Sequence, residues 1–321
     1  MHVNKASSEF LKGYFSTNDR REKTKAAYIS DLAQFQDFVG ENFDILSLKN
    51  TDMERWVANL KSKGYSPASI RRKITVLKVF CTYWVRQGLL IESPFWRVKI
   101  NFGRVVQLPR TLTEQEIQNL LAQTQKNYST LKNSQNKIEF GSQIKKRSPF
   151  RDYLVLRNIA LLELLFATGM RVGEVSAINI KDFISAEASF KVKGKGGRER
   201  LAFIVDKVTV KIQQEYLKAR QQVQTESSAL FLNARGSRLS PQGIANVIRQ
   251  LRRDSGIERH ITPHMLRHTV ATLLLRNGVD IRVVQEFLGH ASISTTQRYT
   301  HVAKEHMIRE LQTRHPSLTF R

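Results

Sequence analysis

Apolar residues recur every three to four positions through most of the first hundred residues, which predicts a small bundle of helices. One helix is expected within residues 24–39. A second begins at a capping box formed by Thr51 and Glu54, and a third begins at Ser66-Pro67, an N-cap followed by proline at the first helical position. The inward-facing residues of these three helices are Tyr28, Leu32, Phe35 and Val39; Met53, Trp56, Val57 and Leu60; and Ile70, Ile74, Leu77, Cys81 and Trp84.

After this unit, residues 106–112 form a predicted linker, and a second capping box, Thr113 with Glu116, opens another helix that is expected to end near Thr124. Residues 125–147 are polar and rich in lysine, so we predict a basic insertion without regular structure there. Residues 153–167 are apolar on nearly every side, which predicts a central buried helix. Thr168-Gly169 ends it, and Arg171 follows directly.

The apolar period changes from helical spacing to alternation over residues 189–205, which predicts a β-hairpin whose tip is rich in glycine and lysine. Helices are then expected over residues 208–220 and 241–253, from Thr262-Pro263 to Gly278, from Asp280 to Leu288, and from Ser294 onward. The predicted fold class is mainly α with a small β-hairpin or sheet (α+β). The predicted domains are residues 1–105, all helical, and residues 113–321, carrying the insertion.

The charge balance adds information about the partner, because 52 Lys and Arg against 28 Asp and Glu give a net charge of +24. Residues 1–107 hold 18 basic and 10 acidic residues, and the remainder holds 34 and 18, so both parts are positive. Such a balance favours a polyanionic partner, DNA or RNA before an anionic membrane, although a solvated basic surface is the alternative. In the N-terminal unit Arg71, Arg72, Lys73 and Lys78 are the candidate DNA contacts; solubilising charge is the other interpretation.

The single cysteine, Cys81, lies in an apolar pattern, so burial is expected and an internal disulfide or a cysteine zinc site is excluded. No run approaches the roughly 18 apolar residues of a membrane span. The N-terminus lacks a signal-peptide core. A cytoplasmic protein without a membrane partner is expected.

Chemistry-bearing residues concentrate between Thr262 and Val302. His264, Arg267 and His268 share one helix face through their i, i+3, i+4 spacing; His290 follows the next helix, and Tyr299 comes after it. His264 and His268 have the spacing of a zinc helix, but the motif lacks the glutamate of H-E-x-x-H, and an arginine lies between them. No carboxylate cluster suits Mg²⁺ and no P-loop is present.

Two upstream residues, Arg171 and Lys195 on the hairpin tip, complete a metal-free set that suits attack on a phosphodiester. Fixed arginines and imidazole N–H groups spread the developing negative charge. Tyr299 suits the nucleophile, although its ordinary pKa of about 10 requires activation, and Lys195 suits the acid for the leaving oxygen. Two alternatives remain open: Arg171 as a surface residue paired with Glu174, and Lys195 as a charge that keeps the hairpin edge soluble.

The segments TGMRVGE, VKGKGGRER, TPHMLRHTVAT and LGHASISTTQRYTHV resemble the tyrosine recombinase (phage integrase) family, most closely its Xer-type members. The resemblance implies a core-binding domain followed by a catalytic domain. It implies a catalytic set of Arg171, Lys195, His264, Arg267 and His290 with the nucleophile Tyr299, and a supporting carboxylate, Glu174.

The resemblance further implies a 3′-phosphotyrosyl intermediate and a Holliday junction, without ATP, metal or other cofactor. The partner is double-stranded DNA with paired sites, bound by a homo-tetramer, alone or with a second recombinase. Residues 304–312 are expected to dock on the neighbouring protomer. Lys193 is an alternative to Lys195, His268 is expected to be structural, and His301 has no assigned role. The insertion favours an element-specific enzyme over chromosome dimer resolution, and a type IB topoisomerase or an inactive DNA-binding factor are the rival functions.

Overall fold

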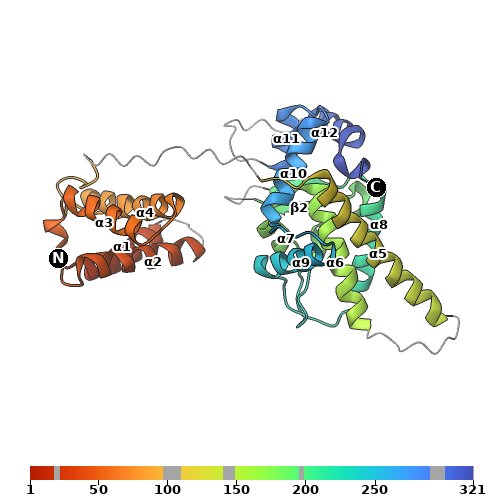
Figure 1. Cartoon of the computed structure of the whole chain (residues 1–321), viewed down its shortest axis with the longest axis horizontal. Helices are drawn as coiled ribbons and strands as arrows, with labels where there is room; N and C mark the ends of the chain where they lie inside the picture. Colours follow the sequence, from red (N-terminus) through yellow and green to blue (C-terminus); the bar gives the residue numbers. More distant parts are fainter. Residues whose placement is uncertain (18–21, 97–109, 140–148, 195–198, 290–300, 321) are drawn as a thin grey trace. The chain divides into compact units, whose positions relative to one another are not determined.

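The computed structural model describes residues 1–17, 22–96, 110–139, 149–194, 199–289 and 301–320. The chain divides into two compact units, Met1–Val106 and Gln107–Arg321 (Figure 1). The structure is mainly helical with one small antiparallel sheet, so the predicted fold class is confirmed. None of the helices in the described ranges is long and apolar enough to cross a membrane.

The N-terminal unit is a helical bundle around an aromatic core. It consists of α1 (Val3–Thr17), α2 (Glu22–Val39), the short 3-10 helix η1 (Ile45–Ser47), α3 (Asn50–Ser62) and α4 (Pro67–Arg86). Phe10, Phe35 and Phe80 are fully buried, and Phe10 packs edge-on against Phe80. Cys81 is buried as expected, which raises the pKa of its thiol to about 12 and leaves it protonated at neutral pH.

Two helix starts in this unit test the sequence reasoning. Ser66 caps α4 as predicted, because its Oγ accepts a hydrogen bond from the Ser69 N–H at 3.2 Å. The capping box assigned to Thr51 and Glu54 is wrong: α3 begins one residue before Thr51, and the Lys49 N–H donates to the Asp52 carboxylate at 2.9 Å. The observed N-cap lies two residues before the predicted one. The buried residues of the helix are nevertheless the predicted ones, Met53, Trp56, Val57 and Leu60.

Lys73 is a second correction, since it is not part of an exposed basic face. It is only 2% exposed, and its ammonium donates to the Asp31 carboxylate at 2.8 Å and to the Gln34 amide oxygen at 2.7 Å. Arg72 also pairs with Asp31, whose side chain is fully buried. Lys73 lies three residues after Ile70 and four before Leu77, which places it on the buried stripe of α4. It therefore serves as an internal counter-ion.

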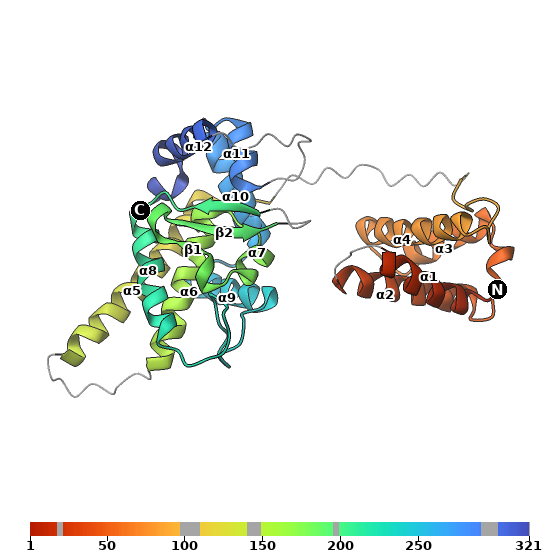
Figure 2. The same ribbon diagram turned by 180° about the vertical axis from the view of Figure 1, so that it is seen from behind.

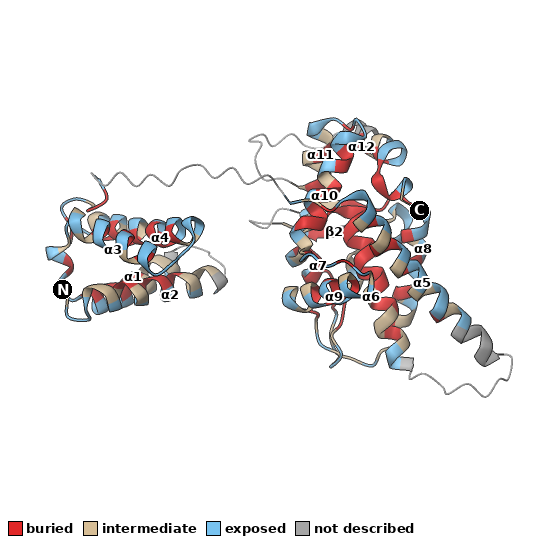
Figure 3. Ribbon diagram, in the orientation of Figure 1, coloured by how far each residue is buried: buried red, intermediate tan, exposed pale blue. Residues whose placement is uncertain are grey.

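The C-terminal unit is built around α6 (Pro149–Thr168), which contacts α5 (Glu114–Glu139), α8 (Lys207–Gln221) and α10 (Pro263–Arg276). Residues 159–162 of α6 are at most 1% exposed, and the buried colour of Figure 3 runs along most of this helix. The predicted central helix is thus present. It ends at Gly169, which adopts a positive φ of 56°.

α5 corrects the prediction of an irregular insertion from Gln125, because the helix continues to Glu139. Leu131 is 2% exposed, and the Tyr128 hydroxyl donates to the Glu215 carboxylate of α8 at 2.6 Å. Lys132 pairs with the same carboxylate at 2.9 Å. These contacts fix a segment whose composition alone suggested a loop. Residues 140–147 of the predicted insertion lie outside the described residues.

The sheet has the order β1-β2-β3 and is antiparallel: β1 (Phe183–Ile184), β2 (Ser189–Lys193) and β3 (Glu199–Phe203). The hairpin of β2 and β3 is the predicted one, with Val192 opposite Arg200 and Lys193 opposite Glu199. β1 was not predicted, since two residues carry too short a pattern to detect. Short 3-10 helices, η2 (Ile180–Asp182) and η3 (Ser185–Glu187), flank β1.

The remaining helices of the unit are α7 (Val172–Ala177), α9 (Pro241–Asp254), α11 (Ile281–Leu288), α12 (His301–Arg314) and the 3-10 helix η5 (Pro316–Leu318). Figure 2 shows α10, α11 and α12 on the same side of the unit. Met307 and Leu311 of α12 are buried in the core of their own unit. The helix expected from Ser294, with its tyrosine, lies outside the described residues.

Candidate active site

The site begins where α6 ends. The Gly169 N–H donates to the Leu165 carbonyl, and a Cβ on this glycine would lie 2.5 Å from Leu288 Cδ2, so the ends of α6 and α11 approach closely. Arg171 follows as the N-cap of α7, and its backbone N–H donates to the Glu174 carboxylate at 2.9 Å. The local sequence therefore turns the arginine side chain out of the end of a buried helix.

Arg171 makes both local and distant contacts. Its Nη1 pairs with Glu174 Oε1 at 2.9 Å, and Nη1 and Nη2 donate to the Gly289 carbonyl at 3.1 and 3.2 Å. The alternative of a local pair with Glu174 is thus observed. It accompanies a contact across 118 residues of sequence, so the pair is part of a larger arrangement.

Arg267 comes to the same place from α10. It is only 7% exposed, and it donates to the Gly169 carbonyl at 2.7 Å and to the Leu288 carbonyl at 2.8 Å. Burial, followed by the positive charge of Arg171, lowers the pKa of Arg267 to about 10, so the guanidinium stays charged at neutral pH.

A third arginine, Arg200 of β3, was missed by the sequence reasoning. Its Nη2 pairs with Glu174 Oε2 at 3.1 Å, and its Nη1 donates to the Phe287 carbonyl at 3.1 Å. Its side chain is 13% exposed. The available signal was a basic residue that directly precedes the apolar run Leu201–Phe203 of the strand, within a segment already singled out as VKGKGGRER.

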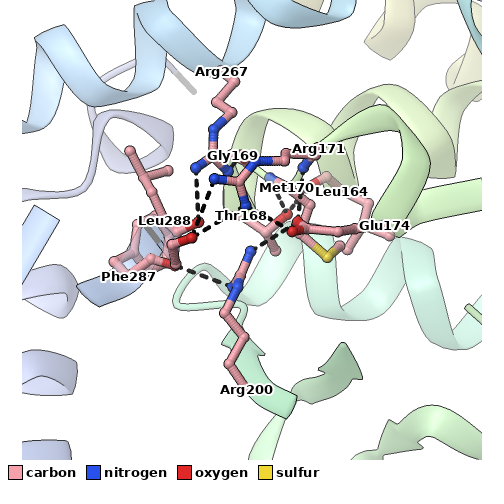
Figure 4. Close-up of polar contacts among 11 residues, drawn as sticks. Leu164, Thr168, Gly169, Met170, Arg171, Glu174, Arg200, Arg267, Phe287 and Leu288 are labelled. Atoms are coloured by element: carbon pink, nitrogen blue, oxygen red, sulfur yellow. Dashed lines mark hydrogen bonds and ion pairs between the residues drawn. The ribbon is translucent and has the colours of Figure 1, made fainter. Parts of the chain in front are cut away.

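The three arginines thus bind three consecutive carbonyls at the C-terminal end of α11 (Figure 4). Arg200 binds the Phe287 carbonyl, Arg267 the Leu288 carbonyl, and Arg171 the Gly289 carbonyl. The last carbonyls of a helix lack partners within the helix and carry its negative dipole end, so they attract cations. Gly289 adopts a positive φ of 68°, which ends α11 immediately before His290.

Glu174 balances this group of cations. Burial disfavours its ionised form, but the charge of Arg200, then the hydrogen bonds and charge of Arg171, outweigh burial and hold the pKa of Glu174 below its usual value. The carboxylate is therefore ionised at neutral pH, and it joins the arginine of α7 to the arginine of β3.

Some of the other candidate residues lie in the described part of the chain, and the rest lie outside it. His264 and His268 lie on α10 as predicted and both are exposed, while Arg267 between them is buried. Lys193 ends β2 and lies 3.7 Å from Glu199. Lys195, His290 and Tyr299 lie outside the described residues. In the N-terminal unit Arg71 and Lys78 are exposed, as a DNA contact requires, whereas Arg72 pairs with Asp31.

Chemically, the described part of the site is a fixed cluster of guanidinium groups. Guanidinium donors suit a phosphate oxygen, because they bind in a bidentate fork and stay charged. Within the described ranges, no group of three or more His, Cys, Asp or Glu side chains is arranged to hold a metal ion. An anion is the ligand that this geometry favours.

Comparison with known proteins gives the family. Residues 110–306 match the phage integrase family, and residues 8–88 match the SAM-like N-terminal domain of phage integrases. The chain is 32% identical to tyrosine recombinase XerC of Listeria innocua, covering 96% of both chains, and 33% identical to tyrosine recombinase XerD of Halalkalibacterium halodurans, covering 95% of both. The XerH recombinase on a palindromic difH substrate, in a post-cleavage complex, has the same fold at 22% identity, with a TM-score of 0.67 over 94% of this chain and 82% of that chain. The chain therefore belongs to the phage integrase family of tyrosine recombinases, the site-specific recombinases that cleave and rejoin DNA.

Proposed function

We propose that Tyr299 is the nucleophile of this recombinase. Its phenolic oxygen attacks a phosphodiester, so that a tyrosyl–phosphorus bond forms at the 3′ end of the cut strand and the bond from phosphorus to the 5′ oxygen breaks. The phenol gives its proton to water, and Lys195 in its ammonium form supplies a proton to the departing 5′ oxygen. The reverse steps, with a 5′-hydroxyl from a partner strand, rejoin the DNA through a Holliday junction.

Arg171, Arg267, His264 and His290 are proposed to hold the phosphate during both steps. The observation that carries this proposal is the convergence of Arg171 and Arg267 on adjacent carbonyls, those of Gly289 and Leu288. Two guanidinium groups fixed at one helix end, directly before His290 in the sequence, support a common role in binding the phosphate. The reaction then requires no metal ion or nucleotide, because the developing charge is met by fixed cations.

The proposed partner is double-stranded DNA with paired recombination sites, bound by a tetramer of this chain or by a mixed tetramer with a second recombinase. The net charge of +24 supports a DNA partner. A tetramer of lambda integrase has been solved on a Holliday junction. Relatives named XerC and XerD match this chain equally well, which supports an Xer-type role in dimer resolution; recombination of a mobile element is the other role.

The test of the nucleophile uses Tyr299→Phe and a nicked DNA substrate that traps the covalent intermediate. The wild-type chain is expected to form a protein–DNA adduct that survives denaturing electrophoresis. Tyr299→Phe is expected to form none while its DNA affinity is unchanged, because only the attacking oxygen is lost. An adduct formed by the variant would assign the nucleophile to another residue.

A plasmid with two sites separates recombination from the topoisomerase alternative. Recombinant product supports the proposal; relaxation of supercoils without recombinant product would support the alternative. Sequencing the DNA trapped by the covalent link in cells identifies the site. It also decides between a chromosomal site and the ends of a mobile element.

A further inference from the structure

We infer that Arg200 is a positioning residue of the recombinase, which fixes the Arg171–Glu174 pair and the end of α11 that leads into His290. The inference rests on the proposed function of Arg171 and His290. Arg200 does not belong to the proposed catalytic set, and its role would be exerted entirely through its neighbours.

The geometry joins three elements through one side chain. Arg200 projects from β3, pairs with Glu174 of α7 at 3.1 Å, and donates to the Phe287 carbonyl of α11 at 3.1 Å (Figure 4). Gly289 packs directly against it, since a Cβ there would lie 2.4 Å from Arg200 Nε and 2.6 Å from its Cδ. Arg200 is thus in contact with both residues that bind Arg171, namely Glu174 and Gly289.

The same residue ties the hairpin to the site. Arg200 is the second residue of β3 and pairs with Val192 of β2, next to Lys193 and Glu199, which form the last pair of the hairpin. The largely enclosed guanidinium of Arg200 holds the start of β3, the strand that follows residues 195–198 in sequence, to α7 and α11. Arg200 therefore orients the elements that carry the proposed acid, one phosphate-binding arginine and His290.

Charge gives Arg200 a second effect. Among the described residues, the charged groups around Glu174 are Arg171 at the N-cap of α7, Arg200 of β3 and, further away, Arg267 of α10. Burial opposes ionisation of Glu174, and the charge of Arg200 favours it together with the two hydrogen bonds and the charge of Arg171. Without Arg200 the carboxylate takes up a proton more readily, and a protonated Glu174 binds the Arg171 guanidinium less strongly.

The experiment compares Arg200→Met and Arg200→Lys with the full-length wild-type chain in single-turnover cleavage of a nicked substrate. Arg200→Met is expected to lower the cleavage rate by about 10- to 100-fold, the usual effect of a misplaced catalytic group, with DNA affinity unchanged. Arg200→Lys restores part of the rate, because an ammonium pairs with Glu174 but lacks the fork that also reaches the Phe287 carbonyl.

Arg220→Met is the matched control for loss of a buried arginine. Arg220 of α8 is 2% exposed and donates to the carbonyls of Ala229 and Ser227, which follow that helix; none of these residues takes part in the contacts of the site. It is expected to lower the melting temperature while the cleavage rate of the folded protein stays at the wild-type level. A similar loss of cleavage in both variants would make Arg200 a purely structural residue and overturn the inference.

Two readouts identify the positioning role. The cleavage rate of Arg200→Met is expected to fall in mildly acidic buffer where the wild-type rate holds, and the double variant with Glu174→Gln is expected to be no slower than the slower single variant. A pH-independent loss, or effects that multiply, would contradict the inference. If the wild-type chain forms no adduct, the proposed function fails instead; the same double-variant cycle measured by melting temperature then decides whether Arg200 and Glu174 are coupled.

Discussion

Gly289 offers a sharp test of how the end of α11 supports the site. Its φ of 68° lies in the left-handed region, so an alanine there costs about 1–2 kcal/mol of backbone strain. The new Cβ would also lie 2.4 Å from Arg200 Nε, closer than two non-bonded atoms can approach. The Gly289→Ala variant must therefore displace either Arg200 or the carbonyl that binds Arg171.

Gly256→Ala is the matched control, because it creates the strain without the collision. Gly256 ends α9 with a φ of 70°, and a Cβ on it would meet no atom within 4 Å. About 1 kcal/mol lowers the melting temperature of a unit of this size by roughly 2–4 °C, and that loss is expected in Gly256→Ala with an unchanged cleavage rate.

The assay measures covalent adduct formation on a nicked substrate under single-turnover conditions, at a temperature where both variants are folded. Gly289→Ala is expected to cleave about 10- to 100-fold more slowly than Gly256→Ala, since a displacement of about 1 Å at a catalytic group has an effect of this size. Wild-type cleavage by Gly289→Ala would refute the idea that the end of α11 positions the site.

Three further predictions concern charged residues. Lys73→Met, which leaves the buried Asp31 with Arg72 alone, is expected to lower the free energy of unfolding by up to about 3 kcal/mol; tryptophan fluorescence during denaturation measures it, since all three tryptophans lie in the N-terminal unit. Lys78→Ala is expected to leave stability unchanged and to reduce the salt dependence of DNA binding by about one counterion, read from the slope of log affinity against log salt. Glu174, whose pKa is lowered in the folded state, contributes stability above its unfolded value near 4.5 and loses it as the pH falls. The melting-temperature difference between wild type and Glu174→Gln should therefore be largest near neutral pH and shrink in acid.

The sequence was sufficient for the family, the fold class and most helix starts. Apolar period and N-cap residues such as Ser66 and Thr262 act locally, so their effects can be inferred from a few neighbouring positions. Thr113 and Glu116 form their predicted capping box, with hydrogen bonds of 2.7 and 3.2 Å. The resemblance to tyrosine recombinases is confirmed by matches along nearly the whole chain.

Three of the failures have a common physical cause, because each depends on a partner distant in sequence. Lys73 is buried because Asp31, 42 residues earlier, neutralises it. Residues 125–139 are helical where composition favours a loop, because Tyr128 and Lys132 meet Glu215 of α8. Arg200 was passed over because its partners, Glu174 and the Phe287 carbonyl, come from two other elements.

The site itself was predicted in part. Arg171 and Arg267 were selected for their chemistry, and the structure brings them to adjacent carbonyls. The hydrogen bonds of both arginines to the carbonyls at the end of α11 could not be predicted from the sequence, because they depend on how the helices pack. The roles of Lys195, His290 and Tyr299 remain predictions, which the Tyr299→Phe experiment addresses first.

The binding of α11 by three arginines also has a consequence for how the enzyme folds. The hydrogen bonds of Arg171 and Arg200 to α11 span 118 and 87 residues, and contacts of such long range form late in folding because they close large loops. A chain still emerging from the ribosome has not yet folded the end of α11. In a chain whose C-terminal unit has partly opened, the three arginines are no longer hydrogen-bonded to that helix end. DNA cleavage is therefore expected to appear in one step at the end of folding, when the three arginines and the end of α11 have come together.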